Sequence, residues 1–159
     1  MPMVFVQEAK ELEHMHRLHD TIQLVSRCIP IFMEEKPEMQ QLPGEERARV
    51  YEILLRFSRN ALIYLGQYVQ TIREMRTIVN SANALEADDM QGIVDENSTT
   101  AMFKIGNLNC RRRTAMRQSV MYTEAARQII IKASLDGPDV ALLLARDDPV
   151  PRGVLCEVA

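Results

Sequence analysis

The chain has 159 residues and a formal net charge of −3 at pH 7, with 47% hydrophobic residues, ten methionines and no tryptophan. This length and composition predict one folded domain, 1–159, and exclude a chain that is disordered throughout. Methionine, leucine, alanine, arginine and glutamate favour helices, whereas the aromatic residues typical of sheets are scarce, so we expect an all-α fold.

The first predicted helix covers about residues 4–29 and carries one apolar seam. Apolar residues recur along it at spacings of three and four, which indicates a buried face with heptad character. The seam consists of Met15, Leu18, Ile22, Val25, Ile29 and Phe32. Pro30 should end or kink this helix, because a proline clashes with the carbonyl group four residues earlier. The segment Glu34–Gly44 contains two prolines and is predicted to be a linker.

Two long helices follow. The first of them, about 45–80, starts after Pro43 and keeps a helical period of apolar residues throughout. Residues 81–97 carry five acidic and no basic groups and lack a clear period, so they are predicted to form an acidic connection. The next helix, 98–135, is about as long as its predecessor, which favours an antiparallel hairpin.

A short helix, 138–146, and a tail, 147–159, complete the chain. Prolines in the tail exclude a regular helix, so we expect it to lie extended on a surface. The predicted architecture is therefore an elongated antiparallel bundle of three long helices, with a short C-terminal helix and an extended tail. A narrow core cannot bury all the apolar side chains of this chain, and those left exposed are expected to lie at interfaces with partners. These side chains are Phe5, Ile31, Phe32, Val154 and Leu155.

Charge distinguishes the helix predicted for 98–135, which carries seven basic groups and one acid. Three consecutive arginines on a helix turn through about 200°, so at least one of them must approach another helix or a partner. In one interpretation it pairs with Glu52, Glu74 or the acidic connection, or stacks on Tyr64 or Tyr68. In the other, the basic side chains form a strip that binds phosphates or an acidic partner. The strip consists of Lys104, Arg111, Arg112, Arg113 and Arg117.

Residues suited to catalysis or metal binding are few. Glu13 and His16 have the i, i+3 spacing of helical metal ligands, with His14 and His19 beside them. A di-metal site needs a second such pair, and the chain has no other histidine, so solvated or interface histidines are favoured over a zinc or iron site. No nucleophile motif, phosphate-binding glycine loop or Cys-x-x-Cys pair occurs, so we expect neither enzyme activity nor a cofactor.

The cysteines and the terminal segments indicate where in the cell the protein is expected. Cys28, Cys110 and Cys156 are widely separated and odd in number, which is typical of reduced thiols in the cytoplasm or nucleus. No secretory signal and no apolar run of about 20 residues is visible, so neither secretion nor a transmembrane segment is expected. The last four residues match a prenylation box at Cys156, without the upstream basic residues that stable anchoring needs.

The sequence thus favours a non-enzymatic structural subunit that assembles with copies of itself or with other proteins through its helical faces. The alternative is an RNA-binding coat or nucleoprotein subunit, located in the virion if the chain is viral, with the Arg111–Arg117 strip on the RNA backbone. The negative net charge and the scarcity of aromatic residues favour assembly over RNA binding.

Overall fold

The computed structural model describes the backbone of residues 2–87, 91–146 and 148–149. Side chains are described for residues 10, 12–80, 102–146, 148 and 149. These parts of the chain contain helices and no strand, so the predicted all-α class is confirmed.

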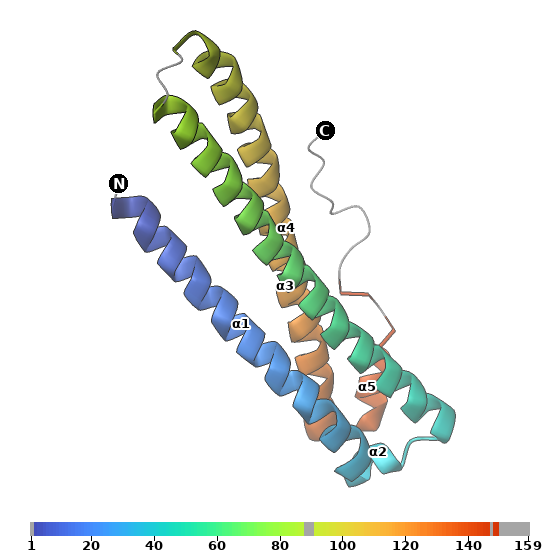
Figure 1. Cartoon of the computed structure of the whole chain (residues 1–159). Coiled ribbons are helices and arrows are strands. Elements are labelled where there is room, and N and C mark those ends of the chain that lie inside the picture. Colours follow the sequence, from blue (N-terminus) through green and yellow to red (C-terminus); the bar gives the residue numbers. More distant parts are fainter. Residues whose placement is uncertain (1, 88–90, 147, 150–159) are drawn as a thin grey trace.

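Three long helices run alternately down and up the molecule, as predicted (Figure 1). They are α1 (Pro2–Glu35), α3 (Gly44–Ala87) and α4 (Gln91–Asp136). Two short helices, α2 (Pro37–Gln40) and α5 (Pro138–Leu144), lie at the lower end of the bundle in this view. The predicted tail, 147–159, lies outside the described residues except at 148 and 149.

The hairpin of α3 and α4 contains most of the core. Phe57 of α3 packs against Tyr122 of α4 with ring centroids 5.6 Å apart, and Tyr64 of α3 stacks on the same tyrosine at 5.8 Å. Such offset aromatic contacts add about 0.5–1.5 kcal/mol each beyond the area that they bury. Most of the remaining buried positions of α4 carry small or aliphatic side chains, which let the two helices approach closely. They include Ala115, Ser119, Ala126, Ile129 and Ala133.

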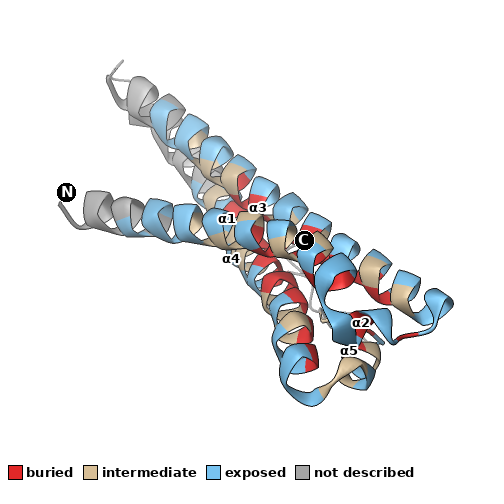
Figure 2. Cartoon of the chain, turned by 90° about the horizontal axis from the view of Figure 1, so that it is seen from below, coloured by how far each residue is buried: buried red, intermediate tan, exposed pale blue. Residues whose placement is uncertain are grey.

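Helix α1 packs on this hairpin with its C-terminal half and diverges from it toward its N-terminus (Figures 1 and 2). The predicted seam is confirmed: Ile22, Val25 and Ile29 are buried, and Leu18 above them is half-buried against the core. Figure 2 shows that the buried residues of the described parts lie on the sides of the long helices that face one another.

Pro30 lies inside α1 and does not end it, so the predicted helix end at this residue is wrong. The helix continues to Glu35 and carries Phe32 and Met33 into the core, where they are 3% and 1% exposed. Burying two such side chains stabilises the fold by about 1.5–3 kcal/mol each, which matches or exceeds the ~3 kcal/mol cost of proline in a helix.

The predicted acidic connection is mostly helical. Helix α3 continues to Ala87 and α4 already begins at Gln91, which leaves only residues 88–90 between them. A period of apolar residues indicates that a helix has a buried face, so a segment without such a period can still be helical. Alanine, leucine, glutamate and methionine in this stretch have high helix propensity, and extending an existing helix is easier than nucleating one.

The predicted linker between α1 and α3 contains the short helix α2, whose Met39 is fully buried. Gln40 stabilises this corner, because its Nε2 donates hydrogen bonds to the carbonyl oxygens of Met33 and Glu34, both at 2.9 Å. These carbonyls lie at the end of α1, where no further turn can satisfy them. Arg47 of α3 donates in turn to Oε1 of Gln40 at 2.7 Å, which ties α1 to the start of α3.

Candidate functional site

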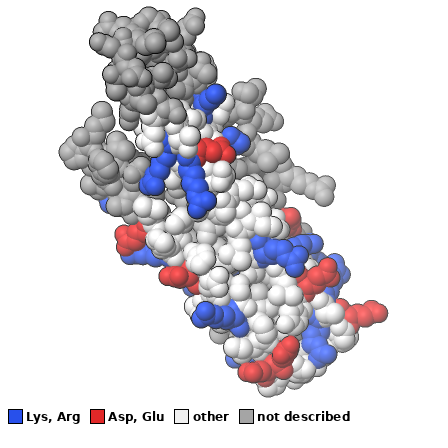
Figure 3. All heavy atoms as spheres, viewed as in Figure 1, with Lys and Arg blue, Asp and Glu red and all other residues white. Residues whose placement is uncertain are grey.

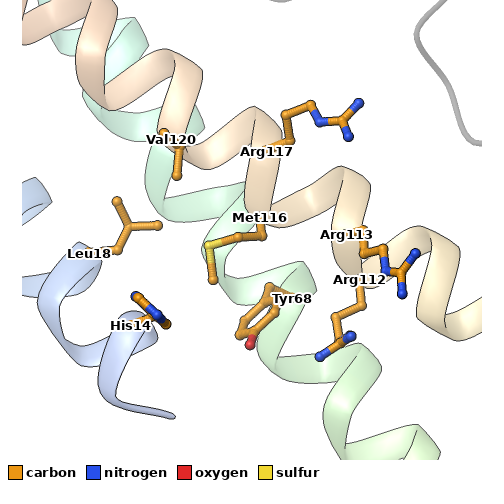
Figure 4. A pocket seen from close by; sticks show the side chains of 8 residues that line it. All are labelled: His14, Leu18, Tyr68, Arg112, Arg113, Met116, Arg117 and Val120. Carbon is orange, nitrogen blue, oxygen red and sulfur yellow. The ribbon is translucent and has the colours of Figure 1, made fainter. Parts of the chain in front are cut away.

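An open cleft of about 470 Å³ lies where α1 diverges from α3 and α4 (Figure 4). Helix α1 forms one wall, α4 forms the opposite wall, and α3 contributes a tyrosine between them. The cleft is lined by His14, Leu18, Tyr68, Arg112, Arg113, Met116, Arg117 and Val120. None of these residues is acidic, so the three arginines share the cleft with one histidine and with apolar side chains.

Helix geometry explains which basic residues reach the cleft. Arg113 and Arg117 are four residues apart and therefore share one side of α4. Arg111 is turned by about 200° from Arg113, and Lys104 by about 180°, so both lie across the helix. The structure thus brings Arg112, Arg113 and Arg117 of the predicted strip together and separates Lys104 and Arg111 from them.

The arginines differ in their partners. Arg112 donates through Nε and Nη2 to Oδ1 of Asn109, at 3.1 and 2.7 Å, which holds its guanidinium along α4. Arg111 Nη2 lies 3.9 Å from Oε2 of Glu74 in an exposed pair, and such pairs contribute about 0–1 kcal/mol. Within the described side chains, Arg113 and Arg117 are exposed and have no hydrogen bond or ion pair.

Of the internal partners predicted for the arginine run, Glu74 lies against Arg111. Tyr64 stacks on Tyr122 instead, and Tyr68 is only 3% exposed beneath the cleft. The predicted pairing with the acidic connection, 81–97, falls outside the described side chains.

The region around the cleft is basic although the whole chain is acidic. Residues 69–80 and 102–117 together carry seven basic groups and one acid, Glu74. Two acids near the cleft in sequence have partners, since Glu13 pairs with Arg17 at 2.6 Å and Glu124 with Arg127 at 3.0 Å. Figure 3 shows that acidic and basic side chains alternate over the lower part of one face of the bundle. Among the described residues that line the cleft, three are arginines and none is acidic.

The three histidines do not converge. His14 lines the basic cleft, whereas His16 and His19 line a second cleft of about 400 Å³ between α1 and α3. Its other lining residues are uncharged: Met15, Leu62, Leu65, Gly66 and Val69. Among the described residues, no group of three or more His, Cys, Asp or Glu side chains lies close enough to hold a metal ion.

The remaining predicted site residues are dispersed. Ile31 is 51% exposed on α1, whereas Phe32, predicted to lie at a partner interface, is buried in the core of its own chain. Phe5, Val154, Leu155 and Cys156 lie outside the described side chains.

The cysteines on the described helices are in different states. Cys28 is a free, half-buried thiol on α1. Cys110 is disulfide-bonded, so the expectation of reduced thiols does not hold for it. In the part of the chain that the structure describes, no helix has the length and apolarity needed to cross a membrane.

His14 was missed as a member of the basic site, although its position carried a signal. His14 lies four residues before Leu18 of the predicted seam, and residues four apart share a helix face. The same reasoning places Met116 and Val120 together on α4. The divergence of α1, which turns these positions into a cleft rather than a packed core, has no comparable signal.

Comparison with protein family models, with curated protein sequences and with solved structures finds no match for this chain. Its function is therefore inferred from the geometry and charge of the described residues.

Proposed function

We propose that this protein is a non-enzymatic nucleic-acid-binding subunit that holds backbone phosphates at its basic cleft. The observation that supports this proposal is the exposure of Arg113 and Arg117, one helical turn apart, without an acidic partner among the described residues. A guanidinium offers five donors in a planar fork that matches phosphate oxygens, and it stays charged at any physiological pH.

The negative charge of the whole chain does not oppose this proposal, because screening makes the local field decisive. At physiological salt the Debye length is about 8 Å, so acids elsewhere on the bundle act weakly at the cleft. Binding through phosphates releases counterions, and about three phosphate contacts predict a salt slope near −2 for a single strand. We expect such a subunit in the cytoplasm, the nucleus or a virion, the locations anticipated from the sequence.

The test is binding of a fluorescently labelled oligonucleotide, followed by anisotropy at about 50 and 200 mM salt. The double variant Arg113→Glu/Arg117→Glu should weaken binding by tenfold or more at the lower salt, because two phosphate contacts become repulsive (order of magnitude). The matched control is Lys104→Glu/Arg111→Glu, which changes the net charge equally on the other side of α4. Circular dichroism should confirm that both variants remain folded.

Two results would contradict the proposal. Binding that does not respond to salt excludes phosphate contacts. An equal loss of binding in both double variants indicates a diffuse charge effect and removes the cleft from the mechanism.

A second candidate function, assembly with further copies of the chain, is supported by a second apolar row on α1. Leu24 and Ile31 are 61% and 51% exposed, and the half-buried Cys28 lies between them at the 4, 3 spacing of a helix–helix seam. The row is self-complementary, because in an antiparallel pair of α1 helices the leucine of one copy faces the isoleucine of the other.

Assembly through this row has its own test. Two Cys28 thiols would lie near the two-fold axis of such a pair, so mild oxidation or a short bismaleimide should link two chains covalently. Leu24→Glu should abolish both the link and any dimer seen by light scattering. A wild-type chain that stays monomeric at high concentration would exclude this interface.

A further inference from the structure

The interior of the basic cleft is apolar, whereas its charged groups lie at the rim. Figure 4 shows Leu18 and Met116 in the space between α1 and α4, while Arg113 and Arg117 extend away from α1. Leu18 and Met116 are both half-buried against the core, and Val120 beside them is 41% exposed. A ligand that fills the cleft must therefore combine an uncharged, flat or apolar part with negative groups next to it.

The cations are arranged for a chain of negative groups rather than for one small anion. Arg113 and Arg117 are offset by about 6 Å along α4, and Arg112 is turned by about 100° from Arg113. Arg112 is also held along the helix by Asn109. The three guanidinium groups therefore do not meet at one point, and successive groups of a polyanion suit them better than a single phosphate.

We infer that the cleft takes an unstacked base of a single-stranded nucleic acid, with the flanking phosphates on Arg113 and Arg117. This inference rests on the proposed function and specifies its ligand. The cleft volume of about 470 Å³ lies within the range of about 300–1,000 Å³ that small-molecule sites occupy. Bases of a single strand can be splayed out and inserted between side chains, whereas those of a duplex are held in the stack.

The mode of base contact follows from the lining. Tyr68 is only 3% exposed, so its ring cannot present a full face for stacking. The base would instead lie against the thioether of Met116 and the aliphatic side chains of Leu18 and Val120, with the imidazole of His14 at the edge. Such contacts do not read base edges, so we expect single strands of different sequence to bind with similar affinity.

The experiment compares three labelled ligands of equal length: a single-stranded RNA, the corresponding duplex, and an abasic phosphodiester strand. We expect the single strand to bind about fivefold or more tightly than either of the others, the change expected from burying part of one base against apolar side chains. An oligonucleotide that contains 2-aminopurine should gain fluorescence on binding, because that base loses its stacked neighbours.

A substitution that fills the cleft provides the structural test. Val120→Trp should lower the affinity for the single strand toward that of the abasic strand. The matched control is Val79→Trp on α3, because Val79 is similarly exposed, at 44%, and does not line the cleft. Both variants change an exposed helix position, and thermal unfolding checks that they fold.

The outcomes separate the two proposals. Equal binding of the single strand and the abasic strand overturns base insertion and leaves phosphate binding at the cleft intact. Tighter binding of the duplex also overturns it. A third outcome is that polyglutamate of the same charge displaces the labelled strand as effectively as unlabelled single strand does. That result overturns a nucleic-acid ligand and indicates an acidic protein partner. If the Arg113→Glu/Arg117→Glu variant and its control, Lys104→Glu/Arg111→Glu, bind the oligonucleotide with equal affinity, the proposed function itself is contradicted.

Discussion

Ser119 of α4 donates a hydrogen bond from Oγ to the main-chain carbonyl oxygen of Ala61 in α3, at 2.8 Å. Both residues are completely buried, so the two helices are in direct contact at this level. Thr123, one turn later on α4, instead donates its hydroxyl to the carbonyl oxygen of Ser119 in its own helix. Hydroxyl groups are thus accommodated in the core because backbone carbonyls of both helices accept their hydrogen bonds.

Two substitutions at Ser119 should separate hydrogen bonding from packing. Ser119→Ala removes one hydrogen bond and should destabilise the fold by about 1 kcal/mol. The loss stays this small because the carbonyl of Ala61 still accepts a hydrogen bond within its own helix. Ser119→Leu should cost more, by about 1–3 kcal/mol or beyond, because the added carbons force α3 and α4 apart. Urea unfolding followed by circular dichroism measures both changes. A leucine variant as stable as the wild type would contradict the close contact.

Two isoleucines of α1 should respond differently to the same truncation. Ile29 is fully buried between α1 and the hairpin, whereas Ile31 is 51% exposed. Ile29→Ala should lower the free energy of unfolding by about 2–5 kcal/mol, because it leaves a cavity in the core. Ile31→Ala should change it by no more than about 0.5 kcal/mol. Measurement in dilute solution keeps any self-association out of the comparison, and similar losses for both variants would contradict the packing of α1.

The fold was predictable to the extent that buried faces repeat along the sequence. Ile22, Val25 and Ile29 recur at spacings of three and four, and their burial follows directly from that pattern. The local cost of proline predicts a helix end or a kink at Pro30, whereas the burial of Phe32 and Met33 beyond it favours continuation of the helix. The helical ends of the hairpin were missed because helix propensity can extend a helix where no apolar period is present.

The candidate site was predictable in its charge and not in its geometry. The arginine run at 111–113 is evident in the sequence, and rotation by about 100° per residue already separates Arg111 from Arg113. Which side of α4 faces α1 depends on how three helices pack, and no local pattern contains that information. His14 joins the arginines only because α1 crosses the hairpin at this level.

A tyrosine at the lower half of the bundle should make stability depend on pH in the alkaline range. Burial, a hydrogen bond from its hydroxyl to Oδ1 of Asp148 at 2.9 Å, and the charge of that carboxylate raise the pKa of Tyr122 from 10.0 to about 12. Because the pKa is higher in the folded state, this tyrosine contributes stability that is complete below about pH 10 and is lost as the pH rises through about 12.

Absorbance titration of the four tyrosines should therefore show one late ionisation step near pH 12. Tyr122→Phe should remove that step and flatten the loss of stability between about pH 10 and 12. Tyr51→Phe, a substitution outside this contact, should leave the late step in place. A Tyr122→Phe variant that retains the late step would show that another tyrosine occupies the buried, carboxylate-bonded position.

Two glycines should respond to alanine with opposite signs. Gly137 joins α4 to α5 with a φ of 104°, in the left-handed region that a β-carbon disfavours, so Gly137→Ala should destabilise the fold by about 1–2 kcal/mol. Gly66 lies within α3, and an added β-carbon would meet no atom within 4 Å. Gly66→Ala should therefore stabilise the fold by about 0.5–1 kcal/mol, because it reduces the conformational freedom of the unfolded chain. Thermal unfolding of both variants decides the matter: a loss at Gly66 would mean that α1 packs more closely on α3 than the second cleft allows, and a gain at Gly137 would mean that the turn into α5 has another conformation.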